Sequence, residues 1–190
     1  MNTNPVLVRS RRFRLVDILP AALALLCTGC TGVYVSRPIG DQPHALVPAD
    51  WEGTWTLGKG ALVAHVTDAA GGKLHYSVTS VRDGAFATTT TEVVVRESGG
   101  WLFANIPDES NPERYEWARV KMANGQIFVW RPDQEAFRAL VQGGKLKGQL
   151  IDKDVTLEPL SAEQMKALTT GALGAPFKWD EPFVFHRLGD

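Results

Sequence analysis

Apolar and polar residues alternate with a period of two over most of the chain after Trp51, which is the pattern of half-buried β-strands. The clearest example is a pair of segments at 62–66 and 74–78, in which every second residue is apolar. The residues between them, 68–72, read Asp-Ala-Ala-Gly-Gly, which is typical of a turn. The two segments are therefore expected to form a β-hairpin.

The same alternation continues towards the carboxyl terminus, with turn residues between the segments. Strands are expected at 54–57, 86–96, 101–106, 115–122, 126–131, 145–151, 155–158 and 183–188. Asn124-Gly125 separates two of them, and Asn-Gly between alternating segments is a strong hairpin signal. About nine or ten short strands with antiparallel neighbours throughout close into a barrel or stack as a sandwich.

Two segments have helical spacing instead. Residues 132–142 begin with proline and acidic residues, carry apolar residues at i, i+3 and i+4, and end at Gly143-Gly144. Ser161 and Gln164 have the spacing of a capping box at the start of a second helix. We therefore predict a mainly β fold, an antiparallel barrel or strongly curved sheet, with two short α-helices in the carboxyl-terminal half.

The amino terminus has a different pattern, that of a secretory signal peptide. Four arginines precede an apolar run over residues 18–26, and small residues and Cys30 follow at once. The run is too short to span a bilayer, which takes about 20 residues, and Pro20 lies inside it. An ordinary cleaved signal peptide, with Cys30 a bystander, is the alternative interpretation.

Thr28-Gly29-Cys30 resembles the end of a lipobox, the site at which bacterial lipoproteins are cleaved and lipidated, with Cys27 where the family usually has Leu. The resemblance implies that residues 1–29 are removed and that Cys30 carries a diacylglyceryl group and an acylated amino terminus. Thr31, rather than Asp, follows the cysteine, and this implies the periplasmic face of the outer membrane. A Cys27–Cys30 redox pair is the competing interpretation, but it needs a βαβ context that is absent here.

Cleavage would leave 161 residues, which suits one domain. That part has twenty acidic and sixteen basic residues, because the leader holds four of the twenty basic residues and one of the twenty-one acidic ones. With no basic block, nucleic acid is not an expected partner. Residues 30–50 contain three prolines and are expected to be a flexible tether or a loosely packed arm, ahead of a single β-rich domain over 51–190.

Gly53-Thr54-Trp55, at the start of the first strand, resembles the G-x-W signature of calycin and lipocalin barrels. In those families the glycine allows a close backbone approach, the tryptophan plugs one end of the barrel, and an arginine of the last strand packs over it. Arg187 is the matching arginine here, so the resemblance implies a lipocalin-like shape closed by Gly53, Trp55 and Arg187. Segments 100–105, 127–133 and 137–148 also resemble a family of uncharacterised proteobacterial lipoproteins, which implies no activity.

Candidate chemistry is sparse. The hairpin places His65 and His75 opposite each other, about 5 Å apart at Cβ. A zinc site needs three or four protein ligands, and no third is evident, so we expect no metal and no cofactor. Acidic residues at Asp108, Glu109, Glu113 and Glu116 do not have calcium-loop spacing and are expected to form a solvated loop. No catalytic motif is present, and we expect no enzymatic activity.

Six tryptophans remain to be explained: Trp51, Trp55, Trp101, Trp117, Trp130 and Trp179. They can line an apolar ligand cavity, fill the core, or form a partner interface. The first hypothesis is therefore a lipid-anchored barrel that binds a small apolar molecule or lipid. The alternative is an envelope structural or interaction protein with a filled core, whose partner is another envelope protein.

Overall fold

The computed structural model of the protein describes residues 32–82, 85–174 and 176–189. The predicted signal peptide, Cys27 and the predicted lipidation site at Cys30 lie outside the described residues.

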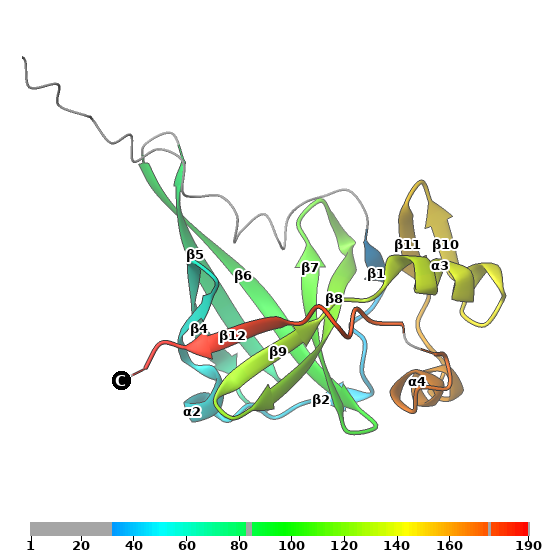
Figure 1. Ribbon diagram of the computed structural model, residues 1–190, viewed down its shortest axis with the longest axis horizontal. Coiled ribbons are helices and arrows are strands. Elements are labelled where there is room, and N and C mark those ends of the chain that lie inside the picture. The colour runs from blue at the N-terminus through cyan, green and yellow to red at the C-terminus, as the bar shows by residue number, and fades with distance from the viewer. Residues whose placement is uncertain (1–31, 83–84, 175, 190) are drawn as a thin grey trace, which may run out of the picture.

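Eight antiparallel strands form a closed β-barrel (Figure 1). They are β3 (Gly53–Leu57), β4 (Gly60–Asp68), β5 (Lys73–Arg82), β6 (Ala85–Ser98), β7 (Trp101–Asp108), β8 (Asn111–Ala123), β9 (Gln126–Trp130) and β12 (Phe183–Arg187). Strands β3 to β9 pair with their neighbours in chain order, including the pair β8–β9. Strand β12 pairs with both β9 and β3 and so closes the ring. The predicted fold class is confirmed.

The predicted hairpins are present in the expected register. His65 lies opposite His75 in the β4–β5 pair, and Leu74 lies opposite Val66. Asn124 and Gly125 have positive φ values of 54° and 69°, which a two-residue turn between right-twisted strands requires. Local turn chemistry therefore sets the pairing of neighbouring strands.

Strand β8 is longer than its partners and divides its pairing between two sheets. Its second half, Arg119–Ala123, pairs with β9 and closes the barrel. Its first half pairs instead with β1 (Val33–Val35), which continues to β11 (Asp154–Leu157) and β10 (Gly148–Ile151). Because β1 and β11 are parallel, the expectation of antiparallel neighbours throughout is wrong at this one pair.

Helix α4 (Ala162–Thr169) begins where the sequence predicts, whereas helix α3 (Gln134–Gln142) begins two residues after the predicted start at Pro132, which forms a β-bridge with Phe177. Helix α3 is capped by Asp133, whose side chain accepts a hydrogen bond from the Ala136 N–H. Helix α4 has the complete capping box of Ser161 and Gln164. A third short helix, α2 (Pro48–Trp51), was not predicted and lies at one end of the barrel (Figure 1).

Residues 32–50 are packed against the barrel, so the predicted flexible tether is wrong over this range. Val33, Val35 and Ile39 are buried in the core, and Leu46 is 3% exposed. The short strand β2 (Gln42–Pro43) pairs with β6, and His44 Nδ1 lies 2.7 Å from Glu97 Oε2. The folded body therefore begins before Trp51, because this segment covers apolar surface that the barrel would otherwise expose.

Two apolar cores lie on opposite faces of the barrel wall. The inner core is built from Leu46, Trp51, Leu74, Val93, Val95 and Val120. The outer core lies between β7, β8 and the β1–β11–β10 sheet, with α3 and α4 on it; its largest members are Phe103, Trp117, Phe137 and Phe177. Figure 1 shows the β1–β11–β10 sheet, α3 and α4 together on one side of the barrel.

Candidate functional site

The barrel contains an apolar cavity of about 370 Å³ that opens to the outside. All eight barrel strands contribute to its wall, mostly through inward-facing residues: Trp55, Leu57, Leu62, Ala64, Leu74, Tyr76, Val93, Val95, Ala104, Ile106, Glu116, Trp117, Ala118, Val120, Ile127, Val129, Phe183 and Phe185. A largely apolar lining with a few polar groups is typical of a small-molecule site. The inner core thus fills part of the barrel and leaves the rest open.

The three residues that the G-x-W resemblance singled out lie together near one end of the barrel, and we call them the Trp55 closure. Trp55 is 1% exposed, and its indole N–H donates to the Trp51 carbonyl oxygen at 2.9 Å. The Arg187 guanidinium lies 5.3 Å from the centre of the Trp55 ring and donates to the Glu52 carbonyl oxygen. Gly53 has a φ of +124°, and a Cβ there would lie 3.4 Å from Arg187 Nε, so the residue without a side chain fits both the backbone and the arginine.

The opposite end of the barrel is polar. Strand β3 is linked to β8 through three antiparallel pairs, β3–β12, β12–β9 and β9–β8, so β3 and β8 run in opposite directions. The start of β8 therefore lies at the end of the barrel away from Trp55. Glu116 is in the first half of β8 and pairs with Ile106. It shares its inward face with Ala118 and Val120, and all three line the cavity. We call this end, with Tyr34, Glu116, Arg131, Gln134 and Lys178, the polar mouth.

Glu116 is partly buried and has no hydrogen-bond or ion-pair partner in the part of the chain that the structure describes. Burial raises the pKa of its carboxyl group, and the nearby charges of Asp108 and Glu109 raise it further, against a lowering by Arg114. A carboxylate in such surroundings accepts a proton more readily than one in water. Sequence reasoning placed Glu116 in a solvated acidic loop; its even spacing with Ala118 and Val120 was the signal that it faces inward.

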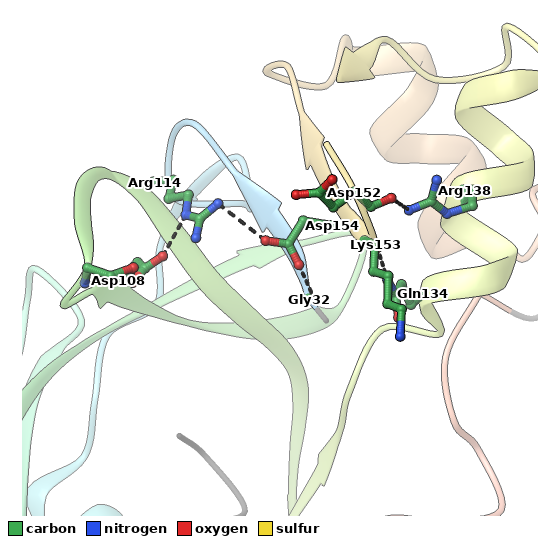
Figure 2. Close-up of polar contacts among 9 residues, drawn as sticks. Gly32, Asp108, Arg114, Gln134, Arg138, Asp152, Lys153 and Asp154 are labelled. Carbon is green, nitrogen blue, oxygen red and sulfur yellow. Dashed lines mark hydrogen bonds and ion pairs between the residues drawn. The ribbon is translucent and has the colours of Figure 1, made fainter. Parts of the chain in front are cut away.

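An ion-pair network ties β8 to the small sheet of β1, β11 and β10 (Figure 2). Arg114 Nε lies 2.5 Å from Asp108 Oδ2, and its Nη1 lies 3.6 Å from Asp154 Oδ2. Asp154 also accepts a hydrogen bond from the Gly32 N–H at 3.0 Å. The Arg114 guanidinium lies 3.7 Å from the Tyr34 ring centre. The guanidinium is therefore paired with two other carboxylates and compensates the charge of Glu116 only in part.

The far side of the polar mouth carries the basic groups. Lys178 Nζ lies 3.0 Å from Asp133 Oδ2. The pKa of Asp133 is lowered mainly by the hydrogen bond from the Ala136 N–H, and the pairing with Lys178 lowers it further. Arg131 is exposed and its guanidinium lies 4.8 Å from the Phe183 ring centre. Gln134 donates to the Lys153 carbonyl oxygen (Figure 2).

The histidine pair lies on the outer surface, away from the cavity. His65 Nδ1 is 2.9 Å from Glu52 Oε1, and His75 Nε2 is 4.0 Å from Glu92 Oε2. Among the described residues, no group of three or more His, Cys, Asp and Glu side chains has the geometry to hold a metal ion. His65 and His75 thus face each other as predicted, each beside a carboxylate.

The six tryptophans divide between the two faces of the barrel wall. Trp51 and Trp55 line the cavity, and Trp117 reaches it from the outer core, where its buried indole N–H has no partner among the described residues. The other three surround Arg119 on the outside, with ring centres 4.2, 4.9 and 4.8 Å from its Cζ; they are Trp101, Trp130 and Trp179. We call this group the Arg119 cluster.

Comparisons with protein-family models, with curated proteins and with solved structures found no match for this chain. Within the described ranges, no helix combines the length and the apolar character needed to cross a membrane.

Proposed function

We propose that the protein is a lipid-anchored lipoprotein of the cell envelope whose barrel binds a small apolar molecule or lipid. The observation that carries the proposal is the apolar cavity between the Trp55 closure and the polar mouth. Its volume lies within the range of about 300–1,000 Å³ that is usual for small-molecule sites. Each Å² of apolar ligand surface removed from water contributes about 25 cal/mol.

Binding can be tested with tryptophan fluorescence, since Trp51 and Trp55 line the cavity. A delipidated protein titrated with apolar probes is expected to show a saturable change in emission. Ala118→Phe fills the cavity at a position opposite Ala104 and is expected to abolish the change. The matched control is Ala61→Phe, on the exposed outer face of β4, which is expected to bind like the wild type.

A milder cavity-filling variant, Ala104→Leu, distinguishes lost binding from misfolding, because it adds less volume to the inner wall. The ligand-binding proposal is wrong if the wild type shows no saturable response, or if both Ala118→Phe and Ala104→Leu bind as well as Ala61→Phe.

The anchor is proposed on the lipobox resemblance alone. The wild type is expected to incorporate labelled palmitate and to fractionate with membranes, whereas Cys30→Ser is expected to be unlabelled and released. Cys27→Ser is the matched control and should still be labelled. Equal fractionation of the wild type and Cys30→Ser would remove the envelope assignment while leaving the cavity proposal intact.

The Arg119 cluster favours a second candidate, an interaction protein of the envelope. Trp179 is 36% exposed, and tryptophan and arginine are the residues most often found at the energetic centre of interfaces. A partner captured by the wild type and lost in Trp179→Ala, with probe binding in the barrel unchanged, would support this candidate.

A further inference from the structure

Glu116 is the acidic side chain in the wall of the cavity, and it lies where the apolar lining meets the polar mouth. Ile106 lies opposite it on β7, and Ala118 is the next residue on the same inner face of β8. No described side chain or backbone group donates a hydrogen bond to it. A partly desolvated carboxylate beside apolar surface costs free energy, and a ligand that donates to it can recover part of that cost.

The basic residues of the mouth are poorly placed to receive an anionic ligand instead. Lys178 is already paired with Asp133 at 3.0 Å, and Arg131 is exposed over Phe183. Exposed charges are screened by water and contribute little. Glu116, being partly buried, interacts in a medium of lower dielectric constant, where a charge acts more strongly.

Neighbouring acids add to the negative potential at this end of the barrel. Asp154 and Glu116 both raise the pKa of the Tyr34 hydroxyl, after the larger contribution from burial, and Asp108 raises it as well. Arg114 opposes them, but it is paired with Asp108 and Asp154. The Tyr34 hydroxyl on β1 and the Glu116 carboxyl on β8 therefore both lie near an excess of negative charge.

From this arrangement we propose that the barrel selects amphipathic molecules with an ammonium head group, held by the Glu116 carboxylate, with the aliphatic tail extending along the cavity towards Trp55. The inference rests on the proposed ligand-binding function and adds the chemical class of the ligand. The ammonium N–H groups donate to the partly buried carboxylate and replace water there, which gives the charge a partner that the described residues do not provide.

Three probes with the same tail test the head group: dodecylamine, dodecanol and dodecanoate, each below its micelle concentration at pH 7. Affinities are measured by tryptophan fluorescence and by calorimetry. The wild type is expected to bind dodecylamine at least about tenfold more tightly than dodecanoate, with dodecanol between them. A tenfold ratio corresponds to about 1.4 kcal/mol.

Glu116→Gln is expected to weaken dodecylamine binding about tenfold and to leave dodecanol within about twofold, since only the charged contact is lost. Glu113→Gln, at an exposed position of the same strand, is the matched control and should change neither. The head-group comparison in the wild type tests the inference even where a variant is poorly folded.

The outcomes separate the two proposals. If none of the three probes binds, the ligand-binding function itself is wrong. If dodecanol binds but dodecylamine has no advantage over dodecanoate, or keeps its advantage in a folded Glu116→Gln protein, the barrel binds apolar molecules and the assignment of the head group to Glu116 is overturned.

Discussion

Two polar side chains of neighbouring strands illustrate how differently a buried polar group can be accommodated. Asn105 is fully buried on the outer face of β7; its carbonyl oxygen accepts from the Ile39 N–H at 2.7 Å, and its amide donates to the Ile39 and Val94 carbonyl oxygens, each at 3.1 Å. Glu116 faces inward and has no such partners among the described residues. The first residue is therefore expected to stabilise the fold and the second to be available to a ligand.

Asn105→Leu is expected to lower the free energy of unfolding by about 2–3 kcal/mol, because it leaves the polar backbone groups of Ile39 buried without partners. Urea unfolding followed by circular dichroism measures the change. Asn111→Leu, at an exposed position, should cost less than about 1 kcal/mol. Equal losses in the two variants would show that the Asn105 hydrogen bonds contribute nothing specific.

Glu116→Gln is expected to raise the stability of the ligand-free protein at pH 7. The pKa of Glu116 is raised in the folded state, so the folded protein binds the proton more tightly than the unfolded chain does. The wild type therefore loses stability as pH rises from the ordinary glutamate pKa through the raised value. The advantage of the variant should therefore be present above this window and absent below it. Thermal unfolding at pH 4 and pH 7 measures it; an advantage of the same size at both pH values contradicts the ionisation argument.

At the scale of elements, the residues before Trp51 are part of the fold. Strand β1 lies between β8 and β11, and the Ile39 backbone is bonded to Asn105. The small sheet and the two helices of the second half pack on the outer core through this strand, with Val33 and Val35 buried in it. The amino-terminal segment is thus a structural element rather than a spacer.

A protein truncated to begin at Asp41 is expected to be largely unfolded, whereas one that begins at Gly32 should fold. The shorter protein lacks buried Val33, Val35 and Ile39. Each such side chain contributes about 1.5–3 kcal/mol when buried, and the sum is comparable with the 5–15 kcal/mol total stability of a domain. Circular dichroism and thermal unfolding compare the two. Equal melting temperatures would restore the tether interpretation for residues 32–40.

The capping box of α4 gives a second expectation at this scale. Ser161→Ala removes the acceptor of the Gln164 N–H and should cost about 1 kcal/mol. Lys166→Ala, at an exposed position of the same helix, should change stability by less than about 0.5 kcal/mol. Chemical unfolding of the two variants checks the difference, and a loss in Lys166→Ala as large as that in Ser161→Ala would argue against a specific role for the cap.

For the whole molecule, the barrel wall is apolar on its inner face all round and on its outer face along one side. The outer surface is covered by the protein's own β1–β11–β10 sheet, α3 and α4. The inner surface is covered only in part, by the inner core and the Trp55 closure. The part of the inner surface that remains uncovered is the cavity.

A bound ligand should therefore stabilise the whole protein. Dodecanol at a free concentration of 100 times its Kd is expected to raise the free energy of unfolding by about 2.7 kcal/mol. Thermal unfolding with and without dodecanol measures the change, and Ala118→Phe should show none. A similar rise in Ala118→Phe would place the binding outside the cavity.

Features that depend on local chemistry could be predicted from the sequence. The period-two alternation predicted the strands, Asn124-Gly125 and the other turns predicted which strands pair, and Ser161 with Gln164 predicted the start of α4. These features are local because a turn fixes the register of its two strands, and a cap acts on the helix that it begins. The proximity of Gly53, Trp55 and Arg187 was expected through a resemblance rather than from spacing.

Features that depend on contacts between distant segments could not be predicted from the sequence and required the folded chain. Nothing local to residues 33–35 indicates a parallel strand beside residues 155–157, since that pairing is set by the apolar surface that both segments cover. Likewise, Glu116 becomes a candidate ligand-binding group only because the barrel closes around it. Closure turns one face of every strand into an interior, and whether that interior is filled or open depends on the combined volume of side chains from all eight strands.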